Sequence, residues 1–187
     1  MLLTVNFYQN LKMNVKEAIE KRRSIRKYKS KEISEELLNE ILEAARLAPS
    51  GNNAQPWKFK VIRDEETKDK LKQNGIFKQD FVYSSPVIIV CCADPDAYPQ
   101  GKFEPGFDDS NEFRASRDLS LACQNLVLRA TDLGLGTCYV GWMNKDKIKE
   151  VLDLPKTYII PYIITIGYAD EKPSVSSRKA KKDIILK

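Results

Sequence analysis

The strongest constraint on the fold is one long periodic segment, residues 114–133, which predicts the longest helix of the chain. Gly134 follows it directly, and glycine commonly ends helices in this way. Leu121 and Leu128 form a second apolar line beside the first. A helix with one face in water does not need that second line, so this helix lies either at the centre of the domain or against another subunit. The first apolar line consists of Ala115, Leu119, Ala122, Cys123, Leu126, Ala130 and Leu133.

The N-terminal part of the chain contains two further helix signals. Asn14 is a predicted N-cap, and Glu17 is expected to reach back to it in a capping box. A second helix is expected to begin at Ser34 and to end at Pro49, because acidic residues fill its first turn and proline cannot continue it. The inward face of the first helix is expected to consist of Val15, Ala18 and Ile19.

The segment Pro86–Ala93 is continuously apolar, which is the pattern of a strand buried on both faces. Helices and strands alternate without a regular β-α-β repeat, so the pattern favours an α+β fold over a doubly wound sheet. The other expected elements are helices over 66–74 and 144–152 and strands over 57–63, 137–142 and 158–168.

Length and composition indicate one domain. The chain has 187 residues, 42% of them hydrophobic, which suits an ordinary globular core. We expect the domain to span 13–187, with residues 1–12 as an N-terminal extension. The net charge of +5 is spread along the chain, so small anionic ligands fit it better than nucleic acid. The aperiodic segment 94–113 is expected to form a loop over a pocket; its aromatic residues are Tyr98, Phe103, Phe107 and Phe113.

The residue types that are missing exclude several kinds of chemistry. The chain has no histidine, which rules out Ser-His-Asp and Cys-His catalysis and histidine-based zinc hydrolysis. No metal site is expected, because the cysteines follow no zinc-ligand spacing, and they are interpreted as core residues. Free thiols and the lack of an apolar segment of spanning length favour a cytoplasmic protein. The four cysteines are Cys91, Cys92, Cys123 and Cys138.

A first candidate binding motif is the run Arg22-Arg23-Ser24-Ile25-Arg26, near the end of the first helix. Guanidinium groups donate paired hydrogen bonds that match a phosphate, and the Ser24 hydroxyl adds a neutral donor. Taken alone, the run is also compatible with an ordinary solvated basic patch.

A second motif is the amide-rich segment 49–57, between the second helix and a strand. Asn and Gln side chains carry both donors and acceptors, which suit the edge of a heterocycle. The same composition also occurs in an ordinary loop that ends a helix.

A third motif is the glycine-containing segment 134–142. It follows a helix and leads into a strand, which is the reverse of the dinucleotide-binding fingerprint, so a Rossmann site is excluded. Its glycines would still allow a flat ligand to approach the backbone.

These segments together resemble the nitroreductase family of flavin enzymes. The resemblance rests on RRSIRKY, APSGNNAQPW, LGLGTCYVGW, YIITIGYADEKP and a basic SRK tail, in the family's order and spacing, from Met13 onward. It implies an α+β fold with a mixed, mostly antiparallel sheet flanked by helices, assembled as an interlocked homodimer. One FMN is expected in each of two clefts between the subunits.

The resemblance also implies roles for particular residues. Arg22, Arg23, Ser24 and Arg26 would hold the phosphate and ribityl chain, and Arg178 and Lys179 would return to the phosphate. Pro49, Ser50, Gly51 and Asn53 would line the flavin from the partner subunit, with Gln55 nearby, while Tyr139, Val140 and Gly141 would face the isoalloxazine ring. No catalytic side chain is expected, because the flavin carries the chemistry.

The implied activity is an FMN-dependent oxidoreductase in which NADH or NADPH reduces the flavin, leaves, and is replaced by a nitroaromatic, quinone or enone acceptor. Other flavin chemistry, such as reductive dehalogenation, and a non-catalytic flavin-binding or storage protein remain alternatives. Three features depart from the family pattern: Tyr139 stands where many relatives have tryptophan, Ala180-Lys181-Lys182 follows Lys179 where Pro-Leu is usual, and the segment 94–113 matches no subfamily.

Overall fold

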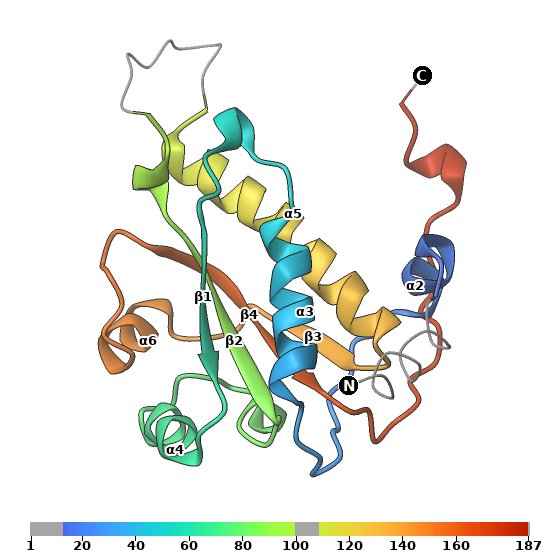
Figure 1. The fold of residues 1–187 in the computed structure, drawn as a ribbon, viewed down its shortest axis with the longest axis horizontal. Coiled ribbons are helices and arrows are strands. Elements are labelled where there is room, and N and C mark those ends of the chain that lie inside the picture. Colours follow the sequence, from blue (N-terminus) through green and yellow to red (C-terminus); the bar gives the residue numbers. More distant parts are fainter. Residues whose placement is uncertain (1–12, 100–108, 187) are drawn as a thin grey trace, which may run out of the picture.

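The computed structural model describes residues 13–99 and 109–186, which form three layers with one antiparallel sheet in the middle (Figure 1). The four strands lie in the order β1-β2-β4-β3. Helices α3 and α5 pack on one face of the sheet, and α4 and α6 pack on the other. The α+β prediction is therefore confirmed. The strands are β1 (Trp57–Ile62), β2 (Val87–Ala93), β3 (Gly136–Val140) and β4 (Ile159–Gly167), and these helices are α3 (Glu35–Arg46), α4 (Glu65–Gln73), α5 (Asn111–Asp132) and α6 (Lys145–Val151).

Strand β2 lies at the centre of the molecule, and every one of its residues is buried. Its side chains alternate between two hydrophobic clusters: Ile89 and Cys91 contact the side covered by α3 and α5, and Ile88 and Cys92 contact the other side. The prediction that this apolar run forms a strand covered on both faces is therefore confirmed. All four cysteines are free and buried, which confirms them as core residues.

Helix α5 begins at Asn111, three residues before the predicted start. Ser110 caps it, with its hydroxyl accepting a hydrogen bond from the Phe113 N–H at 3.2 Å. The first turn is not part of the apolar pattern of the helix, because its one large apolar residue, Phe113, is 58% exposed and lies outside the core. The helix ends before Gly134, whose φ of 76° is the left-handed conformation that glycine adopts easily.

Helix α2 (Val15–Lys21) corrects one prediction. The Asn14 cap is present, since its side chain accepts a hydrogen bond from the Glu17 N–H at 2.9 Å. However, Val15 is 72% exposed and Ile19 is 57% exposed, and only Ala18 is buried. The prediction that all three face the core was wrong for a single copy of the chain, because α2 lies at the edge of the protein beside α5.

The described residues also include four single turns of 3-10 helix, and Tyr98, at the end of one of them, is buried. Phe103, Phe107 and the predicted extension 1–12 lie outside the described residues, and the domain limits stay predictions. No described helix has both the length and the hydropathy that a membrane crossing would require. The single turns are η1 (Gly51–Asn53), η2 (Asp80–Val82), η3 (Pro95–Ala97) and η4 (Lys181–Asp183).

Candidate functional site

The basic segment after α2 packs along the outer edge of β3. Ser24 forms a parallel bridge with Thr137, and the Ile25 N–H donates to the Thr137 carbonyl at 2.9 Å. Gly136 permits this approach, because a Cβ built on it would lie 2.6 Å from Cγ1 of Ile25. This isolated bridge is parallel, whereas the pairs between the four strands are all antiparallel, and it brings the first motif against the third.

The guanidinium groups of Arg22 and Arg26 form no ion pair with any residue in 13–99 or 109–186. Both lie near the thiol of Cys138. Burial raises the pKa of that thiol, and the charges of Arg26 and Arg22 act in the opposite direction. Arg23 differs, because its guanidinium donates back to the carbonyls of Glu20 (2.6 Å) and Arg22 (2.8 Å).

The C-terminal tail begins beside the same segment. The Asp170 N–H donates to the Lys27 carbonyl at 2.9 Å, and the Glu171 carboxylate accepts from the Arg26 N–H at 2.5 Å. Figure 1 shows the tail running past α2. Arg178 and Lys179 are exposed on it, and the Arg178 guanidinium donates to the neighbouring carbonyls of residues 176 and 177, each at 3.1 Å. The structure thus brings the start of the tail, residues 168–171, against the basic segment.

Tyr139 and Val140 follow Thr137 on the edge strand β3, and Gly141 comes directly after it. Apart from the Ser24–Thr137 bridge, no segment in the described part of the chain pairs with the outer side of this strand. Thr137 uses that outer side to bind Ile25, and backbone groups alternate along a strand, so Tyr139 directs its N–H and C=O to the same side. The Tyr139 ring packs edge-on against Tyr162, with ring centroids 4.9 Å apart. Val140 is buried and Gly141 is exposed at the end of the strand. This edge offers backbone donors and acceptors to a flat polar ligand.

The amide-rich loop has an unusual backbone conformation. Asn52, Asn53 and Gln55 have φ values of 55°, 53° and 50°, a region that costs energy for any residue except glycine. The Ser50 hydroxyl accepts a hydrogen bond from the Gln55 N–H at 2.9 Å, which closes the loop on itself. Pro49 and the side chains of Asn53 and Gln55 are exposed.

One buried carboxylate, which the motifs did not predict, holds this loop. Oδ2 of Asp118, on α5, accepts from the Gly51 N–H and from the Tyr98 hydroxyl, both at 2.6 Å. Oδ1 accepts from Nε of Arg117 at 3.0 Å. Burial raises the pKa of Asp118, but the hydrogen bonds from Tyr98, Gly51 and Arg117 outweigh burial and hold this pKa below its usual value.

Asp118 left one signal in the sequence. It occupies the inward stripe of α5, three residues after Ala115 and four before Ala122, where a charge requires a partner. A pattern of apolar spacing counts hydrophobic positions alone, so it does not reveal a carboxylate among them.

Within one copy of the chain, the amide-rich loop and the basic segment lie apart. The loop contacts the N-terminal third of α5, while the basic segment pairs with the strand that follows the C-terminal end of that helix. An apolar groove of about 330 Å³ lies between α2, α3 and α5. Exposed hydrophobic side chains form part of its wall. Its apolar lining includes Val15, Ala18, Ala44, Leu47 and Leu128.

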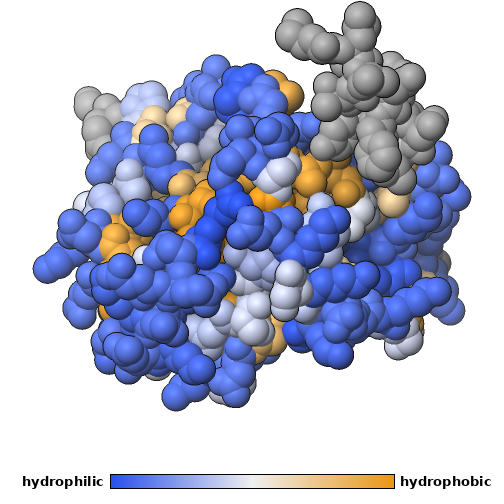
Figure 2. Space-filling model, turned by 60° about the horizontal axis from the view of Figure 1, so that its bottom comes forward, coloured by the Kyte–Doolittle hydropathy of each residue, from blue (hydrophilic) through white to orange (hydrophobic). Residues whose placement is uncertain are grey.

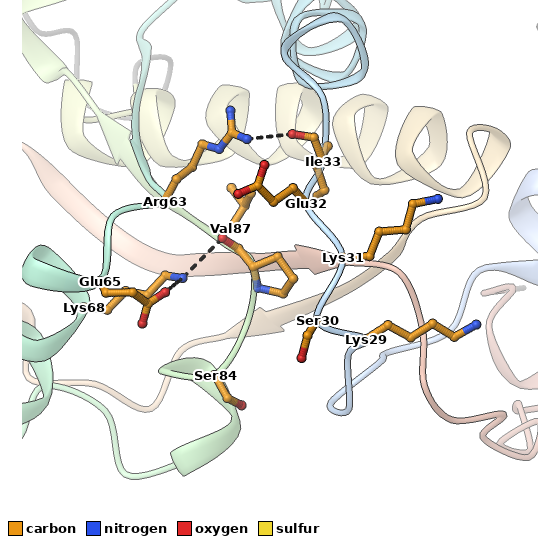
Figure 3. A pocket seen from close by; sticks show the side chains of 11 residues that line it. Lys29, Ser30, Lys31, Glu32, Ile33, Arg63, Glu65, Lys68, Ser84 and Val87 are labelled. Carbon is orange, nitrogen blue, oxygen red and sulfur yellow. Dashed lines mark hydrogen bonds and ion pairs between the residues drawn. The ribbon is translucent and has the colours of Figure 1, made fainter.

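A second cavity, of about 260 Å³, lies beyond the basic segment, where Lys68 reaches across to the Pro86 carbonyl at 3.3 Å and to Glu65 at 2.8 Å (Figure 3). The cavity is lined by several cations, but Lys29 and Lys31 point away from it. Hydrophilic residues cover most of this end of the molecule, with a hydrophobic band across the middle (Figure 2). Because the cations do not converge, we interpret Lys68 as a residue that joins α4 to the start of β2.

Comparison with known proteins gives one consistent result. The nitroreductase family model matches residues 19–75 and 74–168 of the chain. A protein of Methanothermobacter thermautotrophicus, with the provisional name NADH dehydrogenase/NAD(P)H nitroreductase, is 36% identical over 167 residues, which are 87% of this chain and 81% of that protein. The likeness therefore extends far beyond any single motif.

Solved structures agree. A nitroreductase-like protein of Exiguobacterium sibiricum, solved in complex with FMN, matches with a TM-score of 0.83 and 29% identity over 93% of this chain and 97% of that one. A second such protein, from Desulfovibrio desulfuricans and also in complex with FMN, matches with a TM-score of 0.79 and 30% identity over 94% and 96% of the two chains.

Proposed function

The chain belongs to the nitroreductase family, and from that premise we propose that it is an FMN-dependent NAD(P)H oxidoreductase that reduces nitroaromatic, quinone or enone acceptors. The observation that carries the proposal is the pairing of Ser24 and Ile25 with Thr137. This pairing brings the segment that carries Arg22 and Arg26, which form no ion pair within the described residues, to the edge of β3. A phosphate and a flat ring would bind there together.

The donor set fits the phosphate of FMN. A phosphate monoester carries a charge of about −1.5 to −2 near neutral pH and has three acceptor oxygens. Arg22 and Arg26 supply charged donors without competing ion pairs among the described residues, and Ser24 supplies a hydroxyl. The proposed contacts of Arg178 and Lys179 are supported by the pairing of residues 168–171 with residues 26–29.

The position of the loop supports a shared site. One copy of the chain keeps Ser50, Gly51 and Asn53 away from its own basic segment, so we propose that these residues line the flavin held by a second copy. A homodimer would also cover the apolar groove between α2, α3 and α5. The exposed Val15 and Leu47, 72% and 65% accessible in one copy, would then be buried.

The chain's own role in the reaction is binding and placement. When bound, the flavin supplies the hydride chemistry between NAD(P)H and the acceptor. The edge of β3 at Tyr139 would fix the orientation of the ring, and Pro49 and Gln55 of the loop would shield it from water. No histidine exists in the chain to act as a base.

The test uses the purified protein. We expect a flavin absorption spectrum and bleaching of the visible band on anaerobic mixing with NADH or NADPH, followed by recovery on addition of an acceptor. A panel of nitroaromatics, quinones, enones and halogenated aromatics then separates reduction from dehalogenation. A protein that binds FMN but stays oxidised with NAD(P)H is a storage protein, and one that takes up no FMN overturns the proposal.

A further inference from the structure

Asp118 differs from the other acidic side chains near the site in its burial and in what it holds. It is 1% exposed, although a carboxylate is rarely buried unless it is fully paired. Its three partners come from three places: the loop (Gly51), the segment after β2 (Tyr98) and the same helix (Arg117). A group this well satisfied fixes the relative position of these elements.

The partners of Asp118 are themselves held in place. The Arg114 guanidinium lies over the Tyr98 ring, 4.2 Å from its centroid, and Arg117 also pairs with Asp109 at 3.1 Å. The carboxylate is therefore the centre of a network and not an isolated contact. The loop is the one partner whose own conformation is unfavourable, because three of its residues have positive φ.

We propose that Asp118 is a positioning residue for cofactor binding: from α5 it holds the Gly51 N–H, and through it keeps the Ser50–Gln55 loop in its strained shape. This inference rests on the proposed function, in which that loop faces the flavin of the second copy. Asp118 itself touches no ligand in this scheme. It acts by maintaining a loop geometry that the unrestrained backbone would leave.

Asp118→Asn tests the proposal in the holoprotein. The amide keeps the shape of the side chain but loses the charge, and it replaces one of the two acceptor oxygens by an NH2 donor. We expect the Gly51 amide to exchange with deuterium faster, and FMN to dissociate about 10-fold faster or more, which is the effect of losing one hydrogen bond to a charged group. The visible circular dichroism of bound FMN should change as well, because it reports the surroundings of the ring.

A matched control separates positioning from general stability. Asp64 caps α4 on the other face of the sheet, and its carboxylate accepts from the Thr67 N–H at 2.8 Å. Asp64→Ala should lower the melting temperature without changing FMN release or the flavin dichroism.

The outcomes are distinct. If Asp118→Asn releases FMN like the wild type, or if Asp64→Ala accelerates release equally for the same loss of melting temperature, the positioning role is refuted. If the wild-type protein itself binds no FMN, the proposed function fails, and hydrogen exchange at Gly51 still shows whether Asp118 holds the loop.

Discussion

Replacing Gly136 with alanine tests whether the basic segment must pack against β3 to bind the cofactor. A Cβ at this position would lie 2.6 Å from Cγ1 and 2.9 Å from Cβ of Ile25, well inside van der Waals contact. Ile25 is 6% exposed and β-branched, so its side chain cannot rotate away. The segment that carries Arg22 and Arg26 must therefore shift away from the strand.

The magnitude follows from this overlap. Overpacking by one methyl group costs about 1–3 kcal/mol. In a domain of this size each kcal/mol lowers the Tm by about 2–4 °C. A charge-assisted bond from a guanidinium to a phosphate contributes about 1.5–3 kcal/mol, so weakening one such bond accelerates FMN release about tenfold or more.

The assays are thermal unfolding followed by circular dichroism and the rise of flavin fluorescence as FMN leaves the diluted holoprotein. Ile25→Ala is the companion variant, since it removes two of the three close atoms at a cost of about 2–5 kcal/mol for the cavity. The double variant should be more stable than the two single costs predict, by about 0.5–3 kcal/mol. A Gly136→Ala protein with wild-type Tm and wild-type FMN release would refute the reasoning.

Three further predictions concern the phosphate, the dimer and the core. Arg22→Ala should purify with little FMN, measured as the ratio of flavin to protein absorbance, and full occupancy would contradict the phosphate role. Leu47→Lys places a charge in the apolar groove and should give monomers in light scattering together with loss of FMN; an intact dimer would place the interface elsewhere. Burial raises the pKa of Cys92 from 9.0 to about 11, so its contribution to stability is complete below pH 9 and is lost as the pH rises to 11. This loss is roughly 2–3 kcal/mol, and urea unfolding at pH 8 and pH 11 should show a correspondingly smaller decline in Cys92→Ala.

The sequence predicted those elements whose determinants are local. The Ser34 cap is present, with its hydroxyl accepting from the Leu37 N–H at 3.4 Å. The apolar run of β2 needs no partner to be recognised, because it is buried on both sides whichever strands lie beside it. The predicted start of α5 was three residues too late. Ser110 caps a first turn that lacks apolar spacing, so the periodic pattern alone does not show where the helix begins.

The site was predictable only as separate motifs. Nothing in the residue types fixes the pairing of Ser24 with Thr137, because register depends on how distant segments pack. The partnership of Asp118 with Gly51 spans 67 positions and depends on the path of the chain between α3 and β1. The contacts of the tail could not be predicted from its residue types either. The pairing of Tyr28 with Ala169 places the start of the tail beside the basic segment, but it does not fix where the Arg178 side chain points.

The misassigned face of α2 follows from what a periodic pattern can encode. The spacing of three and four residues predicts that Val15, Ala18 and Ile19 lie on one face of the helix. They do, but the chain itself buries only Ala18. A hydrophobic stripe has the same spacing whether it packs on the core or on another molecule. The second apolar line of α5 poses the same ambiguity, with Leu121 43% exposed. The exposed apolar residues of these two helices are what the proposed homodimer would cover, since a second copy of the chain would bury them and bring its own loop to the basic segment.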